Sequence, residues 1–399
     1  MLAPRQDRRA QLQVWQFLLG ILQCTCTVAT CTCTVCTVIV LVGFLTKHAR
    51  RRATHRRAMQ SECNDASSAA AALVLPASDR GAYCALAATA VNGLAVLTAT
   101  DTSPEFEELL DNWICHVSRV GIQPLVWALD EATHHKLQAR RGVRSIYSSN
   151  LRLPERARPN EYKRPSSDEY TLAVSLKPLV VRRVLTLGFD ALFLDVDVAV
   201  NSDPRPWLYR SASASLQISL NYDDRPAQQK ITGLPDLNTG VVFARRNPGT
   251  MALLDQWARR TVERHECPRR PPLWTCGDQE QLTRLLRRCG WKPLTFADAA
   301  RLRASNDAQH VRCGDTIGEL RIEVLPPRLF ASGQTSALWR DHEGNTTRRW
   351  GGHVAPADVL TFHPNFGGFA GGAKKSMLRR VRTQRGGSLW CLDSARRGS

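Results

Sequence analysis

The segment Ala191-Leu192-Phe193-Leu194-Asp195-Val196-Asp197-Val198 places two carboxylates in an otherwise apolar run. A short apolar run predicts a buried strand, and side chains two residues apart lie on the same strand face. Asp195 and Asp197 would therefore lie side by side, where they repel unless a cation or a proton lies between them. Burying either one without a partner is also costly. The segment predicts a site for a hard divalent cation, Mn²⁺ or Mg²⁺, whose shell is completed by water and nucleotide phosphate oxygens.

Apolar runs and amphipathic stretches alternate on the amino-terminal side of this segment. Apolar strands are expected at Gly93 to Ala99 and at Pro124 to Leu129, and amphipathic helices follow Ser103-Pro104-Glu105 and span Tyr170 to Leu187. Ser followed by Pro is typical of a helix start. Strands that alternate with helices predict an α/β domain with a mostly parallel central sheet.

Three other interpretations of the Asp-x-Asp segment compete with a metal site for a nucleotide-bound cation. An EF-hand loop starting at Asp195 would need Gly and Glu where the chain has Val200 and Pro206, so that interpretation fails. A phosphohydrolase of the haloacid dehalogenase type would use Asp195 as nucleophile and Asp197 as acid. Its motif normally opens the domain, whereas a long α/β pattern precedes Asp195 here. A structural role, in which both carboxylates cap backbone or pair with Arg, is the third alternative.

The amino-terminal part of the chain has a different composition. No charged residue occurs from Val14 to Leu45, and a membrane-spanning helix needs about 20 apolar residues. A cleaved signal peptide has a shorter apolar region of about 7–15 residues. We therefore expect a cytoplasmic tail at 1–13, a transmembrane anchor at 14–45, a stem at 46–83 and a catalytic domain at 84–395.

Charge and cysteine usage bound the partners and the compartment. The net charge is +18, but basic residues are scattered without the aromatic interleaving of a nucleic-acid groove, so nucleic acid is not expected as a partner. More basic residues follow the segment 14–45 than precede it, so the positive-inside rule alone would put the C-terminal part of the chain in the cytoplasm. The sequon at Asn345 and the even number of cysteines after the anchor favour a lumenal catalytic domain. Those cysteines are either buried thiols or disulfides, and no C-x-x-C pair predicts zinc.

Several further motifs occur in a fixed order with the Asp-x-Asp segment. They are Thr98 with Asn112-Trp113, Leu125 to Asp130, Lys177 with Val184 to Asp190, Asp203-Pro204, Leu237-Asn238-Thr239-Gly240, Asp278-Gln279 and His363-Pro364-Asn365. This ordered set resembles the nucleotide-diphospho-sugar transferases of glycosyltransferase family 77, known from plants and algae. The resemblance covers about residues 90–380.

The resemblance implies a GT-A-like nucleotide-binding fold, a type II Golgi membrane protein with a lumenal catalytic domain, and transfer from a UDP-sugar with retention of the anomeric configuration. The acceptor would be a glycan or a glycoprotein. It also implies that Asp195 and Asp197 hold Mn²⁺ and the donor and that His363 completes the metal shell. Asp278 is expected to grip the sugar, although N-capping of the helical run 279–286 explains it as well.

The remaining expected donor contacts are small or basic residues. They are Thr98, Asn238, Thr239, Gly240, Gly368, Lys374 and Lys375. We interpret Asn238 to Gly240 as a small-residue loop that leads into a strand and lets backbone approach a sugar. Gly368 lies in a Gly-rich loop that could wrap a diphosphate, with Lys374 or Lys375 supplying positive charge.

The chain departs from the family pattern at two places. Its Gly-rich loop is about a residue longer before the lysines, and Val198-Ala199-Val200 stands where the family has Val-x-Trp. We hypothesise a metal-dependent retaining transferase without an assigned nucleophile, using UDP-galactose, UDP-xylose or UDP-arabinose. The non-enzymatic alternative is a transferase-like protein that binds a sugar without turnover.

Overall fold

The computed structural model describes residues 77–101, 104–153, 168–221, 236–263, 277–292, 307–327, 329–332, 354–355, 359–364, 371–383 and 389–392. Contacts divide the chain into Met1–Val74 and Leu75–Ser399, and every described residue belongs to the second unit. The expected tail, the transmembrane anchor at 14–45, the sequon at Asn345 and the loop residue Gly368 lie outside the described residues. Within the described part, no helix is long and apolar enough to cross a membrane.

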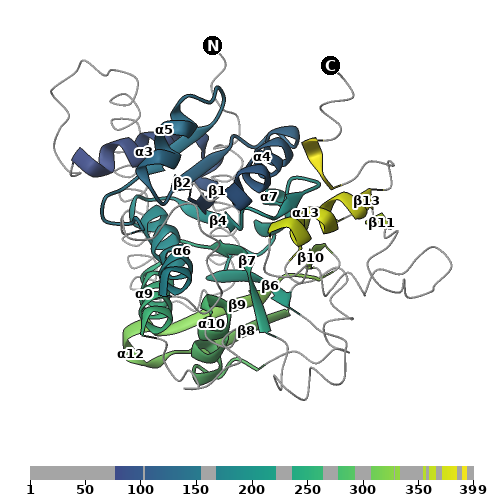
Figure 1. The fold of residues 1–399 in the computed structure, drawn as a ribbon. Helices are drawn as coiled ribbons and strands as arrows, with labels where there is room; N and C mark the ends of the chain where they lie inside the picture. The colour runs from purple at the N-terminus through teal and green to yellow at the C-terminus, as the bar shows by residue number, and fades with distance from the viewer. Residues whose placement is uncertain are drawn as a thin grey trace, which may run out of the picture. The chain divides into compact units, whose positions relative to one another are not determined.

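Helices and strands alternate along this unit, and Figure 1 shows their arrangement. The helices are α3 (Ala77–Thr89), α4 (Pro104–Arg119), α5 (Glu131–Gln138), α6 (Asp168–Thr186), α7 (Arg205–Leu208), α9 (Pro248–Val262), α10 (Asp278–Arg288), α12 (Gly314–Ile317) and α13 (Gly371–Arg380). The strands are β1 (Leu94–Thr100), β2 (Leu125–Ala128), β3 (Arg144–Tyr147), β4 (Asp190–Leu194), β5 (Ala199–Val200), β6 (Leu216–Asn221), β7 (Asp236–Ala244), β8 (Asp307–Arg312), β9 (Glu319–Val324), β10 (Phe330–Ser332), β11 (Val354–Ala355), β12 (Thr361–His363) and β13 (Arg382–Thr383).

The central sheet has eight strands in the order β3-β2-β1-β4-β7-β6-β9-β8. Four of its seven pairings are parallel, β3 with β2, β2 with β1, β1 with β4, and β6 with β9. The expected α/β class with a mostly parallel sheet is therefore confirmed. Because β1 and β4 are adjacent and parallel, the residues that follow these two strands lie at the same edge of the sheet.

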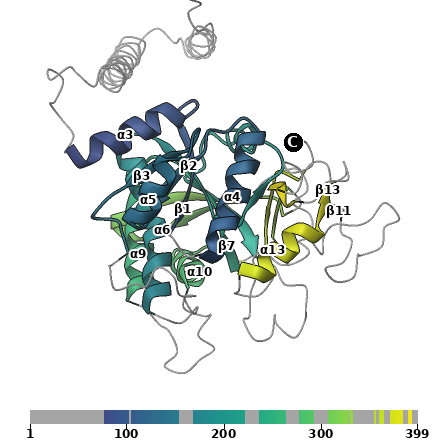
Figure 2. The ribbon, with the colours of Figure 1, turned by 45° about the horizontal axis from the view of Figure 1, so that its top comes forward.

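Both faces of the sheet are covered, which explains why β4 is apolar on both sides. Figure 2 shows α6 and α9 on one side of the sheet and α4 and α13 on the other. Leu192 and Leu194 join a buried cluster with Trp113 of α4. Phe193 points to the other face, where its ring centroid lies 5.6 Å from the Nζ of Lys177 on α6. The helix α4 begins at Pro104, where the sequence predicts a helix start.

The strand that carries the Asp-x-Asp segment is shorter than predicted. The sequence predicts one strand from Ala191 to Val198, but β4 ends at Leu194 and β5 begins only at Ala199. Between them, the backbone N–H of Val198 donates to the carbonyl of Asp195 at 2.9 Å and closes a turn. The prediction that the two carboxylates share one strand face is therefore wrong, because Asp195 and Asp197 lie in this turn.

A second sheet of three strands, β10-β12-β5, continues from this turn. The strand β12 pairs antiparallel with β5, so that Phe362 lies opposite Ala199 and Thr361 opposite Val200. It also pairs parallel with β10. His363 is the last residue of β12. This small sheet brings the late histidine next to the turn that contains the two aspartates.

Disulfides tie distant parts of the described chain together. Cys115 of α4 is bonded to Cys391, and Cys289 is bonded to Cys313. Cys84 is also disulfide-bonded. The sequence alone left buried thiols and disulfides as alternatives, and these five cysteines form disulfides.

Candidate functional site

The turn after β4 presents Asp195 and Asp197 at the carboxyl end of that strand. The backbone N–H of Asp195 donates to the carbonyl of Gly240 on the neighbouring strand β7 at 2.8 Å, which fixes the start of the turn. The Asp195 side chain is 26% exposed and that of Asp197 only 3%. One carboxylate is thus reachable from solvent, and the other is buried and needs a partner.

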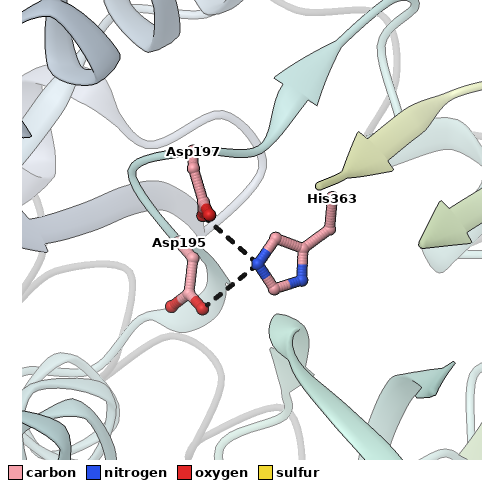
Figure 3. Close-up of side chains that lie close together, drawn as sticks. All are labelled: Asp195, Asp197 and His363. Carbon is pink, nitrogen blue, oxygen red and sulfur yellow. Dashed lines mark ion pairs between the residues drawn. The ribbon is translucent and has the colours of Figure 1, made fainter. Parts of the chain in front are cut away.

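His363 completes a three-residue cluster with these carboxylates. Its Nε2 lies 3.2 Å from Oδ1 of Asp197 and 3.7 Å from Oδ2 of Asp195. Figure 3 shows the imidazole directed toward both carboxylates. One ligand atom from each of the three residues lies within 4.8 Å of the others. The three residues that the sequence proposes as metal ligands are therefore brought together, although they are far apart in the chain.

The donor set of this cluster fits a hard divalent cation. Neighbouring ligands of an octahedral ion with metal–oxygen distances of about 2.1 Å are roughly 3 Å apart. The separations of 3.2 and 3.7 Å from Nε2 to the two carboxylates are close to that value. Two carboxylates and one imidazole suit Mn²⁺ better than a soft metal. The cluster leaves the remaining coordination positions for ligands from outside.

Of the two neighbouring lysines of α13 that the sequence proposes for the site, Lys374 and Lys375, one reaches the cluster. Lys374 of α13 places its Nζ 2.6 Å from Oδ2 of Asp197. Burial by itself would raise the pKa of Asp197, but Lys374 and then His363 outweigh it, so the pKa lies well below its ordinary range. Asp197 is therefore ionised. Lys375 instead pairs with Glu108 of α4 at 3.1 Å, so of the two lysines only Lys374 contacts the cluster.

Lys177 of α6 links the cluster to Asp278. Its Nζ lies 2.8 Å from Oδ1 of Asp195 and 3.0 Å from Oδ2 of Asp278, and its side chain is 11% exposed. Burial alone would lower the pKa of Lys177, but the two carboxylates outweigh burial and raise it above its ordinary value. Lys177 is therefore a fixed positive charge between the two acidic residues.

Asp278 is held by side chains rather than acting as a helix cap. The N-cap of α10 is Gly277, and Asp278 is the first residue of the helix. Its Oδ2 accepts a hydrogen bond from the Thr239 hydroxyl at 2.8 Å. The capping alternative for Asp278 is therefore wrong, because its carboxylate faces Thr239 and Lys177.

The segment Asn238-Thr239-Gly240 lies within β7 and not in a loop before it. Asn238 and Thr239 are buried, and their side chains contact His363 and Asp278. A Cβ at Gly240 would lie 2.2 Å from Nδ1 of His363, so glycine is required here to make room for the imidazole. The loop interpretation is wrong because β7 begins at Asp236, but these residues still line the cluster.

Thr98 lies near the end of β1 and is fully buried. The preceding residue, Leu97, pairs with Phe193 of β4, so Thr98 is close to the edge where β4 ends. Its hydroxyl has no hydrogen-bond partner within the described part of the chain. Thr98 is therefore placed near the carboxyl end of β4, and no hydrogen bond within the described residues joins it to the cluster.

Lys177 is the residue of this site to which the sequence assigned no role, although it belongs to the resemblance. A signal was present. Lys177 precedes Val180, Val181 and Val184 at the three- and four-residue spacing of one helix face, and those valines are fully buried. A lysine on a buried helix face needs an acidic partner.

Comparison with known proteins gives the following matches. A sequence model of the family described as nucleotide-diphospho-sugar transferase matches residues 122–359, more than half of the chain. Beta-arabinofuranosyltransferase RAY1 from Arabidopsis thaliana is 25% identical over 242 residues, which are 59% of this chain and 38% of RAY1. The chain therefore spans less than half the length of this curated relative.

Two solved structures are also similar. The galactosyltransferase LgtC, in complex with donor and acceptor sugar analogs, is 13% identical with a TM-score of 0.33, covering 67% of this chain and 86% of LgtC. Mouse xyloside xylosyltransferase 1, in its apo form, is 13% identical with a TM-score of 0.38, covering 68% of this chain and 98% of that protein.

Proposed function

Because the chain belongs to the nucleotide-diphospho-sugar transferase family, we propose that it is a metal-dependent, retaining glycosyltransferase that moves a sugar from a UDP-sugar to a glycan or glycoprotein. The observation that carries this proposal is the convergence of Asp195, Asp197 and His363 at the end of β4. The family match includes both aspartates but ends before His363. The contribution of His363 therefore supports a metal site by an observation that lies outside the match.

The described residues divide into parts with separate tasks. Asp195, Asp197 and His363 would hold a divalent cation, Mn²⁺ or Mg²⁺, which stabilises the negative charge that develops on the leaving diphosphate. Lys374 adds positive charge at the same place. The hydroxyl of Thr98 and the Nδ2 of Asn238 are both buried and have no hydrogen-bond partner among the described residues. We assign both groups to hydrogen bonds with the UDP-sugar.

Transfer by this site needs no nucleophile from the protein. The bond from the anomeric carbon to the diphosphate oxygen breaks, and an acceptor hydroxyl oxygen forms the new bond to that carbon. The hydroxyl proton passes to the departing diphosphate. Attack from the side on which UDP leaves would retain the configuration. Asp278, fixed by Lys177 and Thr239, would bind a sugar hydroxyl and orient the donor.

The donor is proposed among UDP-arabinose, UDP-galactose and UDP-xylose. We propose UDP-arabinose first, and the name of the relative RAY1, a beta-arabinofuranosyltransferase, supports this choice. The family match and the His363 ligand disfavour a haloacid-dehalogenase type of phosphohydrolase. We also propose a single-pass Golgi membrane protein with this unit in the lumen. The uncharged segment 14–45 supports the anchor, and the disulfides support an oxidising compartment.

The test is binding of UDP and of the three UDP-sugars to the purified chain by calorimetry, with Mn²⁺ and with chelator. We expect UDP binding that requires Mn²⁺ and that is lost in Asp197→Asn. Asp255→Asn is the matched control, because Asp255 pairs with Arg182 on the helix surface outside the cluster. Folded Asp197→Asn protein that binds UDP with unchanged metal dependence would overturn the metal assignment, and turnover of one sugar would name the donor.

A further inference from the structure

We propose that Asn238 is a positioning residue that determines which ring nitrogen of His363 faces the metal. This inference rests on the proposed function, because it concerns the same metal site. No hydrogen bond among the described residues joins Asn238 to Asp195 or Asp197. Asn238 would act on the metal site through the imidazole of His363. Its role would be to keep a proton on Nδ1 so that Nε2 alone can offer a lone pair.

The orientation of the Asn238 amide follows from a backbone group. The backbone N–H of Gly240 lies 2.8 Å from Oδ1 of Asn238, and Nδ1 of His363 lies 2.9 Å from the same atom. An amide oxygen and nitrogen are easily interchanged in a structure, but a backbone N–H can only donate. The atom that faces Gly240 is therefore the oxygen. An oxygen accepts, so Nδ1 of His363 must carry the proton.

A proton on Nδ1 determines the role of Nε2, the other nitrogen of the ring. With Nδ1 protonated, only Nε2 can bind a cation, and Nε2 is the atom that lies 3.2 Å from Asp197 and 3.7 Å from Asp195. The hydrogen bond made by one ring nitrogen sets the ligand role of the other. Partners of this kind orient metal-bound histidines, and their loss typically weakens metal affinity by about 10–100-fold.

An irregularity in β7 places Asn238 for this contact. The pairing of β7 with β6 jumps from Val242 opposite Ile218 to Asn238 opposite Ser219. Such irregularities re-aim side chains and are frequent next to active sites. Gly240, inside the irregular stretch, accepts the N–H of Asp195 and donates its own N–H to Asn238. One bulge therefore holds both the aspartate turn and the acceptor for His363.

A packing role for Asn238 would need only its volume. Leucine has a similar size and would fill the same buried position without a polar atom, whereas an asparagine there must recover the cost of burial through hydrogen bonds. Asn238 is fully buried, and its Oδ1 accepts two hydrogen bonds. The acceptor and not the volume is therefore the property to test.

The experiment measures the affinity of the purified full-length chain for Mn²⁺ alone, by electron paramagnetic resonance of the unbound ion. We expect Asn238→Leu to weaken Mn²⁺ binding by about 10–100-fold. Asn238→Asp keeps the acceptor and should bind Mn²⁺ as tightly as the wild type or more tightly. Gly240→Ala leaves Asn238 intact but places a methyl group 2.2 Å from Nδ1 of His363, so it displaces the ring and calibrates a full loss of this ligand.

Each outcome decides between the two proposals. Unchanged Mn²⁺ affinity in Asn238→Leu, together with loss in Gly240→Ala, would overturn the role of Asn238 and leave the metal site standing. A wild type that does not bind Mn²⁺ would overturn the metal-dependent function itself, and this inference with it. Circular dichroism establishes that each variant is folded, and Asn238→Ala replaces Asn238→Leu if leucine prevents folding.

Discussion

Replacement of Lys177 by methionine removes the buried positive charge between Asp195 and Asp278 while it keeps most of the side-chain volume. Lys177 and Asp278 are 11% and 8% exposed and lie 3.0 Å apart, so water cannot take over the role of the ammonium group. Asp195 is 26% exposed and can be partly hydrated when Lys177 is lost. The penalty should therefore fall mainly on Asp278, which keeps only the hydroxyl of Thr239 among its described side-chain partners.

The size of the effect follows from these distances. At an effective dielectric constant of about 20, two unit charges 3.0 Å apart attract by roughly 5–6 kcal/mol before any desolvation cost. Breaking a buried pair by removal of one partner costs about 3–5 kcal/mol. We expect Lys177→Met to lower the free energy of unfolding by about 3 kcal/mol. Adding Asp278→Asn should recover about 2 kcal/mol, because the unpaired carboxylate is then gone.

Urea unfolding of the wild type, both single variants and the double variant gives the coupling energy between the two positions. Lys177→Arg serves as the control that keeps the charge. A coupling of at least about 2 kcal/mol would agree with a buried ion pair, because any cost of Asp278→Asn alone adds to the recovery seen in the Lys177→Met background. If the two substitutions are additive within about 0.5 kcal/mol, Lys177 and Asp278 do not interact in the way that the distances indicate, and the reasoning is refuted.

Two further predictions concern stability. Loss of the Cys115–Cys391 disulfide by alanine substitution should cost about 2 kcal/mol more than loss of Cys289–Cys313, because the sequence separations are 276 and 24 and the chain-entropy term grows with the logarithm of loop length. Urea midpoints would compare the two pairs, and a larger cost for the shorter loop would contradict the estimate. Burial lowers the pKa of His116 and outweighs the carbonyls of Leu389 and Val200, which raise it. Since the unfolded chain then binds this proton more readily, the free energy of unfolding should fall as the pH drops below about 6.5. His116→Asn should reduce that slope, and an equal slope in both proteins would count against a lowered pKa of His116.

The sequence predicted the class of fold because the relevant signals are local. Apolar runs identified β1 and β2 to within one residue at each end, and the Ser-Pro signal identified the start of α4. The grouping of Asp195, Asp197 and His363 was also predicted, since an Asp-x-Asp at the end of an apolar strand and a histidine at the end of another are both visible in the sequence. The order of the motifs joined them, although no spacing rule relates residues so far apart.

The predictions that were wrong concern features that depend on contacts between residues far apart in the chain. The strand through Asp195 stops because the turn to Val198 is closed by a backbone hydrogen bond and by Gly240 on β7, which no local pattern reveals. Asn238 resembled a loop residue because asparagine and glycine are common in turns. Its real position inside β7 is stabilised by His363, which lies 125 residues further along the chain. The sequence alone did not distinguish the roles of Lys374 and Lys375. They differ in the structure because Glu108 of α4 pairs with Lys375.

The geometry of the cluster of Asp195, Asp197 and His363 depends on backbone pairing. The turn leads directly into β5, and β5 pairs antiparallel with β12, where Phe362 lies opposite Ala199. His363 follows Phe362 immediately, so the position of the imidazole relative to Asp197 depends on this register. A slip of one residue would move His363 by about 3.3 Å and turn its side chain to the other face of the strand. That shift is as large as the 3.2 Å between Nε2 and Asp197. The register is reinforced at one end of this pair, where the side chain of Asn201 donates to the carbonyl of Val359 and the backbone N–H of Asn201 donates to the carbonyl of Leu360. The late histidine can therefore act with an aspartate pair that lies far away in the sequence, because the two segments are neighbouring strands of one small sheet.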